Sequence, residues 1–230
     1  MHLVTISWDD RNNLQRELYE MVSSYVAKTY NKALRNRKKN MCLIFLLIIM
    51  QRMVTSSTAA IRQSLERRLN VLLEQRTCVG NLREEDLDEL NIEDGVEDAL
   101  EAISLDMELE IEELKQIISL AKQAQFQNQD AKVEPLLNEI DAILSEDRTQ
   151  KVIIFTEFVA TQTYLQELLV NRDYTVTILN GGMSIDERNA AMQEFKTSTS
   201  IFISTDAGGE GLNLQFANII INYDLSLIHI

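Results

Sequence analysis

Residues 201–225 of this chain read IFISTDAGGEGLNLQFANIIINYDL, and this stretch decides the fold. It begins with an apolar run, Ile201-Phe202-Ile203, which is typical of a buried strand. Short polar side chains and three closely spaced glycines follow, and a second apolar run closes the unit at residues 218–222. Glycine lets a loop turn tightly and lets a ligand approach the backbone. Because open α/β folds bind ligands at the carboxyl ends of their strands, the pattern predicts a ligand-binding loop rather than a plain connection.

The segment before this stretch alternates between strand and helix patterns. Apolar runs at 152–155 and 175–179 predict strands, and the spacing of apolar residues over 159–170 and 185–196 predicts helices. A lead-in helix is expected over 130–147, with Asp130 as its N-cap. This order predicts an α/β domain with a parallel sheet, flanking helices and right-handed crossovers.

Three segments in this region carry a resemblance to a known family. They are KVIIFTEFVAT (151–161), LNGGMSIDERNAAMQEF (179–195) and STDAGGEGLNLQ (204–215). They resemble motif IV, the segment that follows it, and motif V of superfamily 2 helicases, in the form found in Swi/Snf-type ATPases. Among Swi/Snf-type ATPases, the segments resemble those of the bacterial RNA-polymerase-associated group and its relatives in phage-defence systems. Three motifs in order are far more specific than one glycine loop, so the resemblance implies the second RecA-like lobe of a two-lobed motor.

The resemblance also implies roles for individual residues. Those that match family positions near the nucleic-acid backbone are Thr156, Glu157, Gly181, Gly182, Thr205 and Asp206. Those that match positions facing ATP are Gly209, Glu210, Gly211 and Asn213. Loop amides and hydroxyls of this kind can contact phosphate without reading bases. Phosphate would repel the Glu157 carboxylate, so a network role fits Glu157 better than a direct contact, and a structural salt bridge fits Arg188 better than a phosphate contact.

Other groups that ATP hydrolysis needs do not occur in this sequence. No glycine is followed by Lys-Ser or Lys-Thr, so there is no Walker A loop, and no apolar strand precedes Asp88-Glu89 to make a Walker B pair. The family continues into motif VI with its arginine finger, whereas residues 226–230, SLIHI, resemble a truncated or non-native tail. We therefore expect no catalytic residue here, with ATP and Mg²⁺ bound mainly by a missing first lobe and no activity in this chain alone.

The first 129 residues predict helices. Residues 1–75 contain an amphipathic helix from Leu14 to Ala33, an apolar run at 41–50 and a helix through Leu72. QRMVTSSTAAIRQSLERRL (51–69) resembles the helical extension that follows the first lobe in the Swi/Snf group. The apolar run is shorter than the roughly 20 residues that span a bilayer, so we expect a fully buried helix and no membrane association, although a basic block precedes the run. Residues 76–129 predict an acidic helical insertion and linker, and 130–225 the RecA-like lobe.

The net charge of −14 is local in origin. Residues 84–113 hold 15 acidic residues and no basic one, so the rest of the chain has 36 − 15 = 21 acidic and 22 basic residues. The overall charge therefore does not exclude nucleic acid as a partner. Cys42 and Cys78 are isolated, and the sequence has neither zinc-ligand spacing nor a signal peptide, so we expect no metal site and a cytoplasmic location.

Two functions of different classes remain open. The first is a fragment of an ATP-dependent Swi/Snf-type translocase that tracks double-stranded DNA, with RNA polymerase or a defence complex as possible further partners. The alternative is a non-enzymatic interaction protein whose acidic, coiled-coil-like helix binds a basic partner. A dinucleotide-binding domain is disfavoured because no GxGxxG follows the first strand of the α/β region.

Overall fold

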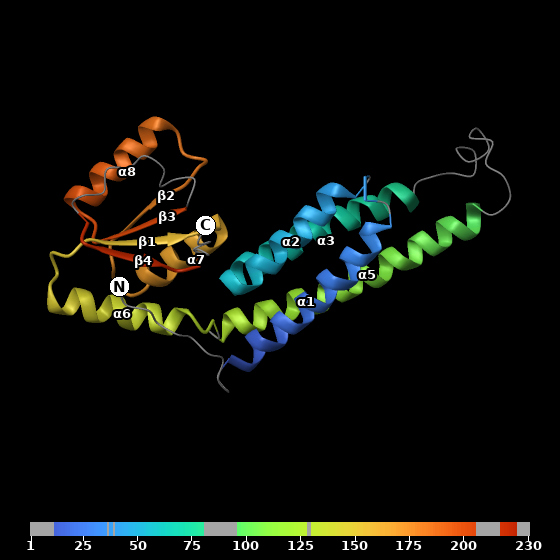
Figure 1. The fold of residues 1–230 in the computed structure, drawn as a ribbon, viewed down its shortest axis with the longest axis horizontal. Helices are drawn as coiled ribbons and strands as arrows, with labels where there is room; N and C mark the ends of the chain where they lie inside the picture. Colours follow the sequence, from blue (N-terminus) through green and yellow to red (C-terminus); the bar gives the residue numbers. More distant parts are fainter. Residues whose placement is uncertain are drawn as a thin grey trace.

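The computed structural model describes residues 12–35, 37–38, 40–80, 96–127, 130–205 and 217–224. These residues form two units that lie side by side along the long axis of the molecule (Figure 1). One is a bundle of long helices, and the other is an α/β lobe that holds the candidate site.

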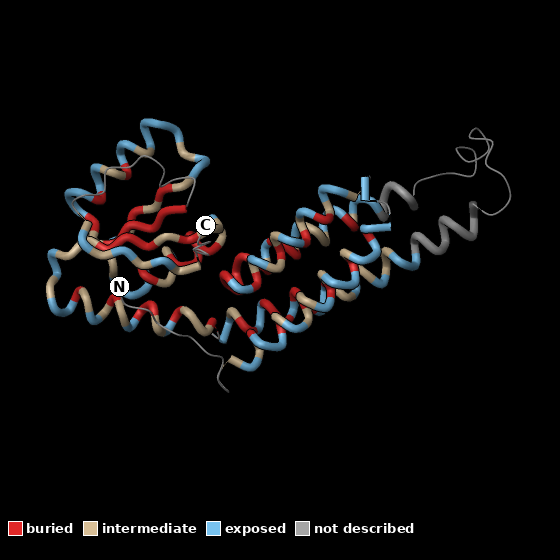
Figure 2. Tube along the Cα trace, in the orientation of Figure 1, coloured by how far each residue is buried: buried red, intermediate tan, exposed pale blue. Residues whose placement is uncertain are grey.

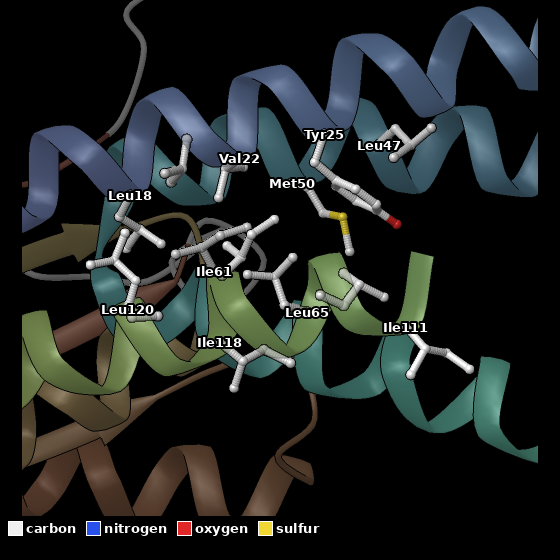
Figure 3. Close-up of a cluster of buried hydrophobic side chains, with 14 of the residues drawn as sticks. Leu18, Val22, Tyr25, Leu47, Met50, Ile61, Leu65, Ile111, Ile118 and Leu120 are labelled. Atoms are coloured by element: carbon white, nitrogen blue, oxygen red, sulfur yellow. The ribbon is translucent and has the colours of Figure 1, made fainter. Parts of the chain in front are cut away.

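The bundle consists of α1 (Asn13–Leu34), α2 (Met41–Ser56), α3 (Thr58–Gly80) and α5 (Val96–Phe126). Both α1 and α3 pack against α2 and α5, so the helices close around a single core. Apolar residues at helical spacing fill that core (Figure 3), and its fully buried members include Leu18, Val22, Tyr25, Leu47, Met50, Ile61, Leu65, Ile111 and Leu114.

The acidic helix α5 belongs to this bundle. Its apolar side packs into the shared core, and its acidic side chains pair with bases on α1 and α3. Glu113 lies 2.8 Å from Lys28, Asp106 lies 2.7 Å from Lys32, and Glu110 lies 2.8 Å from Arg68. The helix of the expected acidic insertion therefore packs within the bundle, because α1 and α3 bury the apolar stripe of α5 and neutralise part of its charge.

One side of α2 faces the core and the other faces solvent. Ile44, Leu47 and Met50 are buried, whereas Phe45 is 65% exposed and Ile48 is 49% exposed. The expectation of a fully buried helix is wrong, because α1 and α3 cover only one side of α2. Among the described residues, α2 included, no helix is both long and apolar enough to cross a membrane.

The lobe contains a parallel sheet with the strand order β2-β3-β1-β4. The strands are β1 (Val152–Thr156), β2 (Val176–Leu179), β3 (Ile201–Thr205) and β4 (Ile219–Asn222). Helices α6 (Val133–Glu146) and α7 (Val159–Val170) cover one face, and α8 (Ile185–Thr197) covers the other. The central strands β1 and β3 are the most continuously buried part of the lobe, whereas β4 at the edge of the sheet is only partly buried (Figure 2). This arrangement confirms the expected RecA-like fold.

Candidate functional site

The carboxyl ends of the strands meet at one edge of the sheet, as they must in a parallel sheet. The register places Thr156 beside Thr205 and Leu179 beside Ser204. The loop Asn180-Gly181-Gly182 therefore leaves the sheet next to the end of β3. This edge is where ligands bind in open α/β folds, so it is the candidate site.

The structure brings together those predicted site residues that it describes. Gly181 and Gly182 are exposed, Glu157 is partly buried, and Thr156 and Thr205 are buried. The remaining predicted residues lie outside the described residues, namely Asp206, Gly209, Glu210, Gly211 and Asn213. At the described part of the edge, the glycine loop is thus the predicted feature that solvent can reach.

Hydrogen bonds hold most amides of this loop. The Gly182 N–H donates to Asn180 Oδ1 at 3.1 Å, and the Met183 N–H donates to the Asn180 carbonyl at 3.3 Å. The Ser184 N–H donates to the Glu187 carboxylate at 2.7 Å. The Gly181 N–H has no hydrogen-bond partner among the described residues, and Gly181 is exposed. This amide is therefore available to an external acceptor such as a phosphate oxygen.

The fold itself does not require a glycine at position 182. A Cβ added there would meet Asn180 Oδ1 at 3.4 Å, which is an ordinary contact, and the backbone is not in the left-handed region. A side chain could therefore be accommodated within the protein. The glycine leaves the exposed side of the loop without a side chain, so that a ligand can approach the backbone closely.

The first turn of α8 supports the same loop. Ser184 and Glu187 form a reciprocal capping box, and the Ser184 N–H and hydroxyl lower the pKa of the Glu187 carboxyl group. Arg188 donates to the carbonyl oxygen of Met183 at 3.1 Å and to that of Gly181 at 3.3 Å. Arg188 therefore has the structural use that we expected, although its partners are backbone carbonyls rather than an acidic side chain.

A buried network, the polar joint, connects the site edge to the bundle. It consists of Ser56, Ser57, Thr156, Thr161 and Asp224. The Asp224 carboxylate accepts hydrogen bonds from the hydroxyls of Ser56 and Thr156, the latter at 2.9 Å. The Thr161 hydroxyl lies 2.7 Å from that of Ser56 and 2.8 Å from that of Ser57. The turn between α2 and α3 is thus bound to the ends of β1 and β4 and to α7.

The polar joint changes how two predicted contacts must be understood. Thr156 has no exposed surface, and its hydroxyl is used by Asp224. The Glu157 N–H donates to Asp224 at 2.8 Å, and its carboxylate lies 2.7 Å from the Arg52 guanidinium on α2. Nucleic-acid contact by these two residues stays a prediction. Their geometry favours a role within the network.

Asp130 makes a second connection between the units. Its carboxylate accepts the Thr58 N–H at 3.2 Å and the Gln15 side-chain amide at 3.3 Å, and its burial raises the pKa of the carboxyl group. Asp130 therefore binds the start of α3, whereas we expected it to be the N-cap of the lead-in helix. That helix, α6, begins at Val133 without a side-chain cap.

Sequence reasoning missed the residues that hold the site in place, which are Ser56, Thr161, Gln162, Asn180 and Asp224. The sequence did not single out Gln162, because α7 carries other polar residues beside it and one turn later, such as Thr163 and Gln166. The described residues contain no group of three or more His, Cys, Asp or Glu side chains that could hold a metal ion.

Comparison with known proteins agrees with the architecture of the lobe. Residues 131–228 match the helicase conserved C-terminal domain. The chain is 41% identical over 98 residues to an uncharacterized ATP-dependent helicase, YqhH, of Bacillus subtilis. The aligned region covers 43% of this chain and 17% of that protein. The chain is also 35% identical over 91 residues to the mouse SWI/SNF-related matrix-associated actin-dependent regulator of chromatin subfamily A containing DEAD/H box 1. This aligned region covers 37% of this chain and 9% of that protein.

The chain spans less than a fifth of the length of these relatives. Among solved structures, the helicase domain of Pyrococcus furiosus Hef aligns with 96% of this chain and 48% of its own, with a TM-score of 0.56 and 18% sequence identity. At that identity the likeness concerns the fold alone, and it extends over both the bundle and the lobe.

Proposed function

We propose that this chain supplies the second motor lobe of an ATP-dependent Swi/Snf-type translocase, because residues 131–228 match the helicase conserved C-terminal domain and the chain is similar to an ATP-dependent helicase and to a SWI/SNF-related regulator. The motor acts on double-stranded DNA in the cytoplasm. The observation that carries the proposal is the exposed glycine loop at the carboxyl edge of the sheet, where the Gly181 amide has no hydrogen-bond partner within the described part of the chain.

DNA contact at this edge involves the sugar–phosphate backbone rather than the bases. A main-chain N–H can bind a phosphate oxygen of any nucleotide, so it positions the duplex without selecting a sequence. Thr205 ends the neighbouring strand β3, next to the point where the glycine loop leaves β2, and Asp206 is the next residue in the sequence. Such a motor can move along a duplex without needing to separate its strands.

The nucleotide binds between this lobe and a first lobe that supplies the Walker motifs. Gly209, Glu210, Gly211 and Asn213 follow β3 in the sequence and are the residues that we assign to ATP. Mg²⁺ is held mainly by the first lobe, so this chain alone is inactive. ATP binding closes the two lobes, hydrolysis reopens them, and the contacts shift along one strand in each cycle. RNA polymerase or a defence complex is the further partner that we propose from the family resemblance.

The alternative of an acidic interaction helix has less support. Three acidic residues of α5, Asp106, Glu110 and Glu113, already pair with bases in the same bundle. Their charge is therefore partly neutralised inside the protein and is less available to a basic partner.

ATP hydrolysis tests the proposed function, measured with and without duplex DNA on the gene product extended to its natural boundaries. We expect DNA-stimulated hydrolysis that is lost in Gly211→Leu and retained in Ala190→Leu, which adds the same side chain on the exposed side of α8. A well-folded full-length protein without hydrolysis would contradict the proposal. Duplex affinity that does not fall with salt would contradict it as well, because phosphate-based binding is strongly salt-dependent.

A further inference from the structure

Gln162 is a buried polar residue at the centre of the site edge. It lies in the first turn of α7 and is completely buried beneath the ends of β2 and β3. Its side-chain Nε2 donates to the carbonyl oxygens of Leu179 and Ile203, both at 2.8 Å. Because both partners are carbonyl oxygens, only the amino end of the amide can face them, which fixes the orientation of the side chain.

The position of these carbonyls explains why an amide is needed there. Leu179 is the last residue of β2, and it pairs with Ser204, next to Ile203 in β3. Beyond this point the chain turns away into the glycine loop. Without Gln162, two buried carbonyl groups would lose a donor, and a buried polar group without a partner is costly.

The other end of Gln162 reaches the glycine loop. Asn180 Nδ2 donates to Gln162 Oε1 at 3.1 Å, and Asn180 Oδ1 accepts the Gly182 N–H at 3.1 Å. The relay α7–Gln162–Asn180–Gly182 therefore fixes the loop from inside the lobe. Arg188 fixes it from outside, through the carbonyls of Gly181 and Met183.

We propose that Gln162 is a positioning residue for DNA: through Asn180 it holds the loop so that the Gly181 amide faces a backbone phosphate. This inference rests on the proposed function and assigns one further residue to it. Gln162 does not touch DNA itself, because it has no exposed surface. Its loss leaves every positive charge in place, so it weakens DNA binding without changing the number of counterions released.

The test compares four variants of the full-length protein, two in the relay and two controls, in fluorescence anisotropy with duplex DNA over a range of salt. Gln162→Leu removes the relay. Gln166→Leu makes the same change one turn later in α7, at a partly exposed position. Ile140→Ala removes core volume from α6, away from the relay, and so controls for lost stability. Asn180→Ala, at a half-buried position, breaks the relay with less risk to folding.

We expect Gln162→Leu and Asn180→Ala to weaken DNA binding about tenfold, the equivalent of one lost hydrogen bond to a charged acceptor. The slope of log Kd against log salt should not change, and both controls should bind as the unaltered protein does. Hydrogen exchange without DNA should show faster exchange in residues 180–183 for the two relay variants alone.

Two results would overturn the inference. One is unchanged exchange of residues 180–183 in Gln162→Leu, because the relay would then not position the loop. The other is an equal loss of DNA affinity in Ile140→Ala, because the effect would then be one of stability. If the unaltered full-length protein does not bind duplex DNA, both the proposed function and the role of Gln162 in DNA binding are wrong. Hydrogen exchange then still decides whether Gln162 positions the loop.

Discussion

Replacing Asp224 with alanine tests whether the polar joint binds the bundle to the lobe. The carboxylate accepts hydrogen bonds from the hydroxyls of Ser56 and Thr156 and from the Glu157 N–H. Each hydrogen bond to a charged group contributes about 1.5–3 kcal/mol, and water replaces part of that loss because Asp224 is only partly buried. We therefore expect Asp224→Ala to lower the free energy of unfolding of this chain by about 3 kcal/mol.

Urea denaturation followed by circular dichroism measures this change. Asp141→Ala is the control, because it removes a nearly half-exposed carboxylate that pairs with Arg172 and accepts a hydrogen bond from the Tyr174 hydroxyl, and we expect it to cost about 1 kcal/mol. Ser56 and Asp224 are in contact, so a double-mutant cycle between Ser56→Ala and Asp224→Ala should give a coupling energy of about 1 kcal/mol or more. A coupling energy near zero, or equal losses for Asp224→Ala and Asp141→Ala, would refute the joint.

Two further predictions concern the glycine loop and the helix that follows it. Gly182→Ala should leave stability unchanged or raise it by about 0.5 kcal/mol, because the new methyl group would meet only Asn180 Oδ1, at an ordinary contact distance of 3.4 Å. The same variant should weaken duplex-DNA binding about tenfold in fluorescence anisotropy, and unchanged affinity would mean that DNA does not approach the loop closely. An NMR titration should place the pKa of Glu187 below its usual value of 4.5, because Ser184 donates to the carboxylate. The ionised Glu187 carboxylate then stabilises the folded state above pH 4.5, and this stabilisation is lost as the pH falls through the lower pKa of the folded protein. Glu187→Gln should remove this acid sensitivity. A variant that kept the acid sensitivity would exclude Glu187 as its source.

The architecture of the lobe could be predicted from the sequence because its signals are local. Short apolar runs bounded by polar or glycine residues marked β1 and β3, and the spacing of apolar residues marked α7 and α8 to within one residue. Strand and helix patterns in alternation then imply a parallel sheet. The structure has the glycine loop at the end of β2, beside the end of β3, and its contact with nucleic acid stays a prediction.

The packing of the bundle could not be predicted in the same way. The apolar stripe of α5 indicates that one side of the helix is buried, but it does not say against which helix. In the structure α5 packs on α1 and α3, and Glu110 accepts hydrogen bonds from Tyr25 at 2.8 Å and from Arg68 at 2.8 Å. These partners lie 85 and 42 residues away in the sequence. The sequence therefore did not show that these acidic residues face bases of the same bundle.

The same limit explains why the first turn of α7 was overlooked, although it links the bundle to the proposed DNA contact. Thr161 binds the hydroxyls of Ser56 and Ser57, and the next residue, Gln162, binds Asn180 and the end of β3. Adjacent side chains on a rigid helical turn cannot move independently, so a displacement of the α2–α3 turn would be carried to the glycine loop through α7. In the proposed function, the first turn of α7 acts through the two partners that it connects, the α2–α3 turn and the glycine loop, whereas Thr156 at the end of β1 is buried.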